Sequence, residues 1–214
     1  MNNFTTNTYE LKREICNFSE KIANGTSKPA KKFVMETQYG LAKGGSCLVS
    51  NMARALDEDI KLNYTIDRLC DNFANLDDEY EKIIWRNYIN EVKKHINTKE
   101  PIAIFDDSDI NKEYSKKLED LDRVRDASSP DKRIVNGYNV CEAVLLSKNT
   151  NQPISVYSKI YSCKSKNFKS KNTYTLDSIK AVENIVGKKF IGIFDRGYDD
   201  KKIFDYMDKK SIHL

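Results

Sequence analysis

The sequence predicts an α/β protein, with a helical region at the N-terminus followed by a mixed sheet with flanking helices. Two observations support this class. Apolar residues recur at helical spacing through roughly the first hundred positions, whereas short apolar runs rich in Val, Ile and Tyr follow Pro101. We therefore expect two domains, a helical module over residues 1–99 and a sheet-containing region over residues 100–214.

Composition excludes several classes of protein. The 214 residues are 39% hydrophobic and 32% charged, with a net charge of +4, so a core can form beneath a charged surface. No apolar run is long enough to span a membrane and residues 1–7 are polar, so we expect a cytoplasmic protein with no membrane partner. Five scattered cysteines and two histidines argue against a disulfide framework, a zinc site or a histidine-based triad. Any chemistry must therefore depend on carboxylates.

Within the helical region, apolar spacing predicts three short helices, at 48–56, 66–73 and 84–92. Thr65 is the expected N-cap of the second helix. Two short helices joined by a brief connection also describe a helix-turn-helix, in which Ser46, Ser50 and Arg54 share one helical face. The alternative is an ordinary helical hairpin. The helix-turn-helix pattern therefore makes Ser50 and Arg54 candidates for DNA contact.

The second region contains short strands in a defined order. We expect a strand at 102–105, a hairpin at 133–146 and 153–161, a helix at 175–186, a strand at 190–194 and a helix at 199–208. Asp106 and Asp107 directly follow the first of these strands, and Asp195 follows the last. The two apolar strands therefore each end in acids.

Aspartates at the ends of two buried strands suit divalent-metal phosphoryl transfer. Hard oxygen ligands bind Mg²⁺ or Mn²⁺, and a pair of ions about 4 Å apart can stabilise both the entering and the leaving oxygen. Carboxylates held close together repel each other unless cations neutralise them. The alternative is that acids after strands only start turns or cap helices.

These acidic runs resemble a known family. The run Ile-Phe-Asp-Asp-Ser-Asp at 104–109 and the run Ile-Phe-Asp-Arg-Gly-Tyr-Asp at 193–199 are similar to the first and second acidic motifs of DDE-type insertion-sequence transposases, whose core is ribonuclease-H-like. The hairpin, helix and strand between the motifs also resemble the order of that fold. The resemblance implies an incomplete ribonuclease-H-like mixed sheet over 100–214, preceded by an N-terminal helical DNA-binding module.

The resemblance also implies an active site. Asp107 and Asp195 would be the catalytic residues and the ligands of Mg²⁺ (or Mn²⁺), and they would act on DNA at the ends of a mobile element. We choose Asp107 over its neighbour because the family's aspartate is typically followed by a hydroxyl residue, here Ser108. Asp106 remains the alternative first ligand.

The sequence departs from the family at the third ligand. In the family this ligand is a glutamate on a later helix, but the chain has no glutamate after Glu183. We therefore expect a C-terminally truncated transposase core that is inactive alone. A second copy of the chain, or a full-length transposase, is the expected partner that supplies the missing part.

A basic segment lies between the two acidic motifs. Residues 148–189 contain nine lysines and only two acids. The expected DNA contacts are the five lysines of its densest part, Lys159, Lys164, Lys166, Lys169 and Lys171. Phosphate contacts by these lysines predict a log–log salt slope of roughly −4. Tyr157, Tyr161 and Phe168 stack on a frayed DNA end or pack on the core, and the alternative for the whole segment is a solvated loop.

Two further hypotheses compete with a transposase. The run at 102–109 also resembles the nucleophile motif of haloacid-dehalogenase-like phosphatases, in which Asp106 would attack phosphorus covalently. A non-catalytic product that binds DNA ends and regulates transposition is the other alternative.

Overall fold

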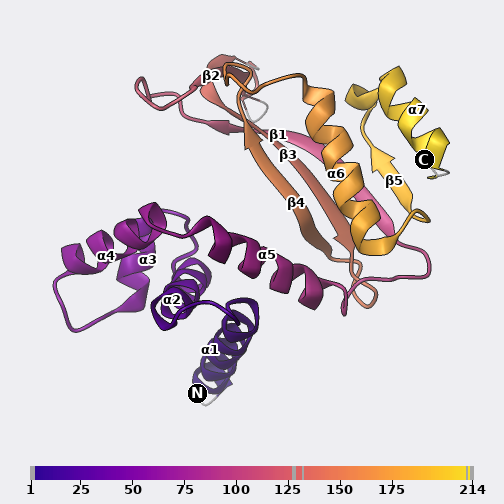
Figure 1. The fold of residues 1–214 in the computed structure, drawn as a ribbon. Coiled ribbons are helices and arrows are strands. Elements are labelled where there is room, and N and C mark those ends of the chain that lie inside the picture. The colour runs from indigo at the N-terminus through magenta and orange to yellow at the C-terminus, as the bar shows by residue number, and fades with distance from the viewer. Residues whose placement is uncertain (1–2, 127–128, 132, 211, 213–214) are drawn as a thin grey trace. The chain divides into compact units, whose positions relative to one another are not determined.

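The computed structural model describes residues 3–126, 129–131, 133–210 and 212. The chain divides into two compact units, Met1–Glu91 and Val92–Leu214, and each is described by itself (Figure 1). The sequence pattern places this boundary slightly later, at residue 99. Among the described residues there are seven α-helices and one mixed sheet of five strands, so the α/β class is confirmed.

The first unit is helical. Its helices are α1 (Asn3–Ile22), α2 (Lys28–Gly44), α3 (Val49–Leu56), α4 (Leu62–Ala74) and α5 (Asp78–Val92). Phe33, Met52 and Leu69 form the centre of one apolar cluster, while Ile22 and Val34 belong to a second. The sequence predicts only the last three helices individually; α1 and α2 are not predicted as separate elements.

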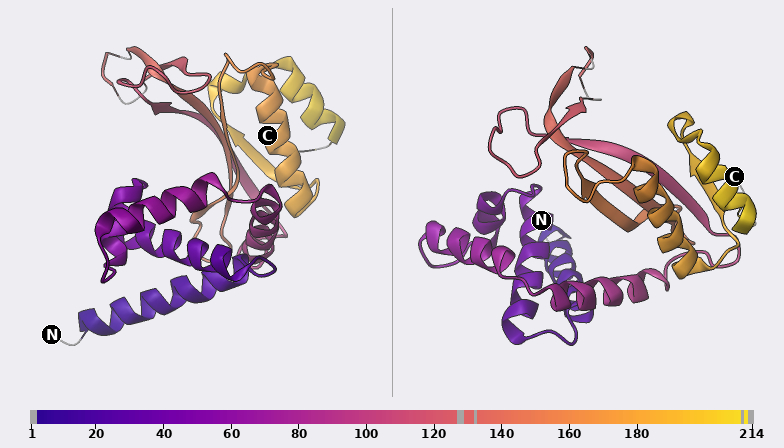
Figure 2. Two further views of the ribbon diagram at one scale, coloured as in Figure 1. Left: turned by 60° about the vertical axis from the view of Figure 1, so that its left-hand side comes forward. Right: turned by 45° about the horizontal axis from the view of Figure 1, so that its top comes forward.

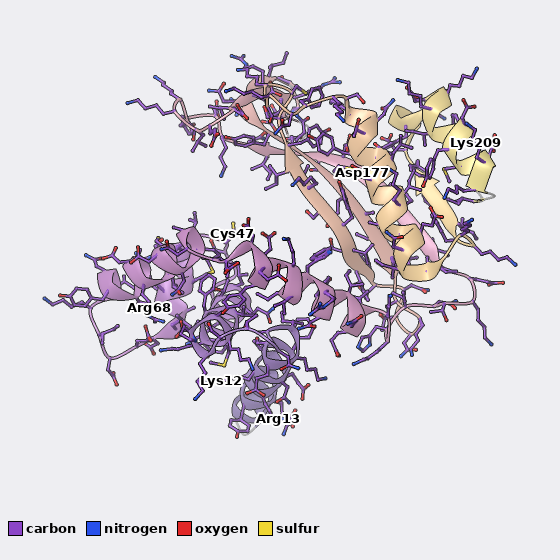
Figure 3. The ribbon with its side chains drawn as sticks, in the orientation of Figure 1. Lys12, Arg13, Cys47, Arg68, Asp177 and Lys209 are labelled. Atoms are coloured by element: carbon purple, nitrogen blue, oxygen red, sulfur yellow. The ribbon has the colours of Figure 1, made fainter. Side chains whose placement is uncertain are left out.

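The prediction that Thr65 caps the second predicted helix is wrong. That helix, α4, begins at Leu62, and Thr65 is buried inside it, where its hydroxyl donates to Glu58 Oε2 at 2.8 Å. Arg68, labelled in Figure 3, forms ion pairs with Glu58 and with Glu36. Leu62 packs against the apolar cluster, so a helix that begins before Thr65 is stabilised by tertiary packing.

The second unit contains the sheet. Its elements are β1 (Ile102–Asn111), β2 (Asp122–Arg125), β3 (Ile134–Leu146), β4 (Pro153–Tyr161), α6 (Lys171–Val186), β5 (Ile191–Phe194), the 3₁₀ turn η1 (Arg196–Tyr198) and α7 (Lys201–Lys210). β3 is antiparallel to β1, β2 and β4, whereas β5 is parallel to β1. The connection through α6 carries the chain from β4 across the sheet, so that β5 can align beside β1 (Figure 2).

The two faces of the sheet have different environments. Ala103, Phe105, Cys141 and Leu145 are buried on the face against which α6 packs, and alternate residues of the same strands lie on the other face. Figure 1 shows α6 lying across β3 and β4. On the other face Ile193 is 46% exposed. We call these the covered face and the open face.

The hairpin, the helix α6 and the strand β5 are confirmed close to their predicted bounds. Two features differ from the prediction. β1 does not end at Phe105 but continues to Asn111, so Asp106 and Asp107 lie inside the strand. The polar second half of β1 is held by pairing with β3, which apolar periodicity does not reveal. The short strand β2 is also absent from the prediction, because it has a single apolar residue, Val124.

Candidate functional site

The strand register places Asp106 beside Asp195. The parallel pairing of β1 with β5 ends with Phe105 opposite Phe194; Asp106 is the next residue of β1, and Asp195 directly follows β5. The backbone of Asp195 is still extended, with φ −78° and ψ 173°. Both aspartates therefore lie on the open face, opposite the two phenylalanine rings, which stack at 4.5 Å on the covered face.

A third carboxylate lies at the same level of the open face. Glu142 is the cross-strand partner of Asp106 in the antiparallel pairing of β1 with β3. Three neighbouring strands thus present Glu142, Asp106 and Asp195. Glu142 is not predicted as a site residue, because the register that aligns it with Asp106 depends on the whole hairpin and leaves no local signal in the sequence.

The electrostatics of Asp106 agree with this crowding. Burial raises the pKa of Asp106, and the charges of Asp195, Asp107 and Glu142 raise it further, against a backbone hydrogen bond that lowers it. A carboxyl group in such surroundings becomes more stable when a proton or a cation neutralises it. Negative charge is therefore concentrated around Asp106 on the open face.

Asp195 also organises the turn that follows it. Its Oδ1 accepts a hydrogen bond from the backbone N–H of Gly197, so Asp195 caps η1. A Cβ atom at position 197 would lie 2.8 Å from Asp195 Oδ1, so a larger residue there would displace the Asp195 side chain from the cap. The alternative that this acid starts a turn is thus realised, and Asp195 Oδ2 is left out of the cap.

Asp107 lies on the other face of the sheet. Its Oδ2 accepts a hydrogen bond from the Tyr161 hydroxyl at 3.4 Å, and its Oδ1 is buried. Burial, followed by the charge of Asp107, raises the pKa of the Cys141 thiol to about 12. The structure therefore brings Asp106, and not Asp107, onto the face that carries Asp195. The physical reason is strand alternation, which sends neighbouring residues to opposite faces.

The residues present fit a divalent cation in part. Within the described residues, no three His, Cys, Asp or Glu side chains gather as ligands of one metal ion. Mg²⁺ is commonly held in proteins by only one or two carboxylates and keeps several water ligands. Asp106 and Asp195, carboxylates on adjacent strands of one face, match that donor set.

A groove adjoins Asp195. Its volume is about 720 Å³, and it is lined by β5, by η1 and by Ile203 and Phe204 of α7. In the part of the chain that the structure describes, β5 pairs only with β1, so its second edge borders this groove. The groove gives the neighbourhood of Asp195 open access from the side of the sheet.

The basic segment after β4 is firmly anchored. Asp122 Oδ2 accepts from the backbone N–H of Cys163 at 2.8 Å, and Lys164 Nζ donates to the Leu121 carbonyl at 2.8 Å. Although burial opposes it, hydrogen bonds from the backbone N–H groups of Arg123 and Cys163 lower the pKa of Asp122. Lys164, a predicted DNA contact, is thus used at least partly to hold the loop.

The aromatic residues of this segment pack on one another. The Tyr161 ring stacks on Tyr174 at 4.2 Å and on Phe168 at 6.2 Å. Of the two alternatives for these rings, packing within the protein is the one observed, since Tyr161 is buried. Tyr161, Phe168 and Tyr174 therefore support the loop through ring stacking.

The remaining predicted lysines are exposed. Lys159 lies on β4, Lys166 and Lys169 lie in the anchored loop, and Lys171 is the first residue of α6. A lysine at a helix N-terminus opposes the helix dipole, so Lys171 contributes no helix capping. These four side chains border a loop whose backbone is fixed by Asp122 and by the aromatic stack.

The predicted helical DNA contacts lie in the first unit. Arg54 of α3 is exposed, and its Nη1 donates to Asn51 Oδ1 at 3.1 Å and to the Ser50 carbonyl at 3.3 Å. Ser46 precedes α3, and its Oγ accepts from the backbone N–H of Leu48. The spacing predicts that Ser46 shares a helical face with Ser50 and Arg54. This prediction is wrong for Ser46, which lies before the helix.

No protein-family model matches this chain, and no curated protein matches it. None of the described helices combines the length and the apolar content that crossing a membrane requires. The site must therefore be interpreted from its own geometry.

Proposed function

We propose that this chain is the N-terminal helical module and part of the catalytic core of a DDE-type transposase, and that it acts on DNA. The single observation that carries the proposal is that Asp106 and Asp195 each directly follow the last residue pair of β1 and β5, Phe105 and Phe194. Each of these aspartates belongs to one of the two acidic motifs that resemble the family. Asp106 takes the role that the sequence alone assigns to Asp107.

The topology supports the proposal. The strands β4, β3, β1 and β5 are neighbours in that order, β5 alone is parallel to β1, and α6 joins β4 to β5. A first strand beside the strand of the second aspartate is what the resemblance to a ribonuclease-H-like core implies. The covalent phosphatase gains no comparable support.

In the proposed site, Asp106 and Asp195 hold Mg²⁺ or Mn²⁺, and Glu142 adds negative charge beside them. The bound cation would stabilise the oxygens that enter and leave during phosphodiester cleavage. Lys159, Lys166 and Lys169 bind DNA phosphates near the sheet. Because no third ligand is gathered among the described residues, a second copy or a full-length transposase completes the site.

Mn²⁺ binding tests the pairing directly. We expect the loss of free Mn²⁺ signal in electron paramagnetic resonance titrations of the intact chain to require both aspartates. Asp106→Asn and Asp195→Asn should each weaken binding by at least about tenfold, because removing a ligand costs more than removing a supporting partner. Asp177→Asn is the matched control, since this exposed carboxylate of α6 pairs with Lys180 and lies outside the site. Equal Mn²⁺ affinity of Asp106→Asn and the parent would defeat the proposal.

Covalent trapping separates the transposase from the phosphatase. A phosphatase would form an acyl-phosphate on Asp106, which can be trapped with borohydride and located by mass spectrometry. The transposase needs no covalent intermediate, so we expect no such adduct after incubation with a phosphomonoester.

DNA binding tests the basic loop. We expect gel-shift affinity to fall steeply between 50 mM and 200 mM salt. Replacing Lys159, Lys166 and Lys169 by Gln should make the log–log slope shallower by roughly 3, because each phosphate contact contributes about 0.9. A control that replaces the exposed Lys99, Lys116 and Lys117 removes the same charge elsewhere. Equal slopes for the two triple variants would exclude the loop as the DNA contact.

A further inference from the structure

Three aromatic rings connect the turn after Asp195 to β1. Tyr198, the last residue of η1, packs edge-on against Phe194 with ring centroids 5.5 Å apart. Phe194 in turn stacks on Phe105 at 4.5 Å with the rings 6° from parallel. Asp107 is two residues beyond Phe105 and therefore lies on the same face of β1. This packing places Tyr198 on the covered face, the face that also carries Asp107.

Two polar atoms are buried in this region without a hydrogen bond within the described structure. They are the hydroxyl oxygen of Tyr198 and Oδ1 of Asp107. The pKa of Tyr198 is raised by burial and further by the charge of Asp107, which agrees with both groups lying on this face. A buried donor and a buried acceptor are each costly when unpaired, and pairing them removes both costs.

We propose that Asp107 and Tyr198 form a buried latch that fixes the turn 195–198 against β1 and thereby holds Asp195 beside Asp106. Asp107 is then a positioning residue that acts through Tyr198. The inference deepens the proposed function, since it explains why two adjacent aspartates occur in the first motif. It rests on that function only for the role of Asp195, because the latch itself is testable without metal.

Disulfide trapping measures the position of Asp195. In the intact chain, the exposed Cys47, Cys70 and Cys163 are replaced by Ser, and Asp106→Cys is combined with Asp195→Cys. Neighbouring strands lie about 4.8 Å apart, which is within the range that a disulfide bridges. We expect rapid closure under mild oxidation. Tyr198→Phe or Asp107→Leu should slow closure about fivefold, the factor for loss of one ordinary hydrogen bond.

Two variants control for general damage to the fold. Tyr206→Phe removes another tyrosine hydroxyl of the same unit, one that donates to Glu183, and should leave the closure rate unchanged. Asp107→Asn keeps an acceptor oxygen and should restore closure to within about twofold of the parent, because its hydrogen bond with Tyr198 can still form. A double variant of Asp107→Leu and Tyr198→Phe should be no slower than either single variant.

The outcomes separate the latch from the proposed function. Closure that is equally fast with Tyr198→Phe and Asp107→Leu would overturn the latch, even if Mn²⁺ binds through Asp106 and Asp195. Closure that depends on both residues in a chain that binds no Mn²⁺ would support the latch and overturn the proposed function. If the chain that carries only Asp106→Cys and Asp195→Cys forms no disulfide between them, the latch and the proposed function are both overturned.

Discussion

Asp106 and Asp107 are adjacent in the chain but belong to different environments. Asp106 is on the open face of the sheet, where Glu142 and Asp195 are its neighbours and where burial, followed by like charge, raises its pKa. Asp107 is on the covered face, where the Tyr161 hydroxyl donates to it. The difference shows that strand alternation divides two similar acids between an electrostatic role and a packing role. Predictions that contrast the two faces test this division.

The largest expected effect is on stability. Phe105 is 1% exposed on the covered face and stacks on Phe194, whereas Ile193 is 46% exposed on the open face. Phe105→Ala should lower the free energy of unfolding by about 3–5 kcal/mol, because it leaves a cavity under α6. Ile193→Ala should cost less than about 1 kcal/mol, since its side chain is already half in water. Urea titrations of both variants compare the faces. Similar costs would mean that the open face is covered in solution.

Asp122, an acid on the covered face, contrasts with Asp106, because its pKa is lowered and not raised. Backbone N–H groups lower the pKa of buried Asp122, so its charged form stabilises the fold. This contribution is present above the ordinary aspartate pKa of about 3.9 and is lost as pH falls through the lower native pKa. We expect Asp122→Asn to cost about 2 kcal/mol at neutral pH, as for hydrogen bonds to a charged group.

The check on Asp122 is the pH dependence of chemical denaturation. The difference between the parent and Asp122→Asn should shrink as the pH falls below about 4. A difference that stays constant with pH would mean that the carboxylate charge plays no part in anchoring the loop.

The third contrast is between the two adjacent aspartates themselves. Asp106→Asn should weaken Mn²⁺ binding by at least about tenfold, whereas Asp107→Asn should change it by less than about threefold, because the amide keeps an acceptor for the buried tyrosines. Isothermal titration with Mn²⁺ measures both. A larger effect of Asp107→Asn than of Asp106→Asn would show that Asp107 is the first metal ligand, as the sequence motif alone predicts.

The strands that carry the site could be predicted from the sequence, but the choice between Asp106 and Asp107 could not. Apolar runs located the strands around both acidic motifs, and the periodicity of 175–186 located α6. The run of apolar residues stops at Phe105, so the sequence gives no reason to extend β1 through Asp106 and Asp107. Which acid faces Asp195 depends on the register with β5, a long-range property that local patterns do not contain.

The tyrosine contacts were missed for a similar reason. Tyr198 belongs to the Arg-Gly-Tyr run, but the packing of its ring depends on Phe105 of β1 and Phe194 of β5. The sequence predicts that Tyr161 contacts either DNA or the core, and only the folded loop places it against Tyr174. Composition predicts that such rings will be used, whereas tertiary packing decides where.

The smallest expected effect is the pH dependence that Asp106 contributes. Because the native pKa of Asp106 is raised, the folded chain holds this proton more tightly than the unfolded chain. Stability therefore falls as pH rises from the ordinary aspartate value of about 3.9 through the native pKa. Without metal at neutral pH, Asp106→Asn should be more stable than the parent by about 0.5 kcal/mol, the scale of exposed charge interactions. Added Mg²⁺ should stabilise the parent and leave the variant unchanged, because it neutralises the repulsion that the substitution removes. Thermal unfolding at several pH values measures these differences, and a parent that is insensitive to Mg²⁺ would show that the acids of the open face tolerate one another without a cation.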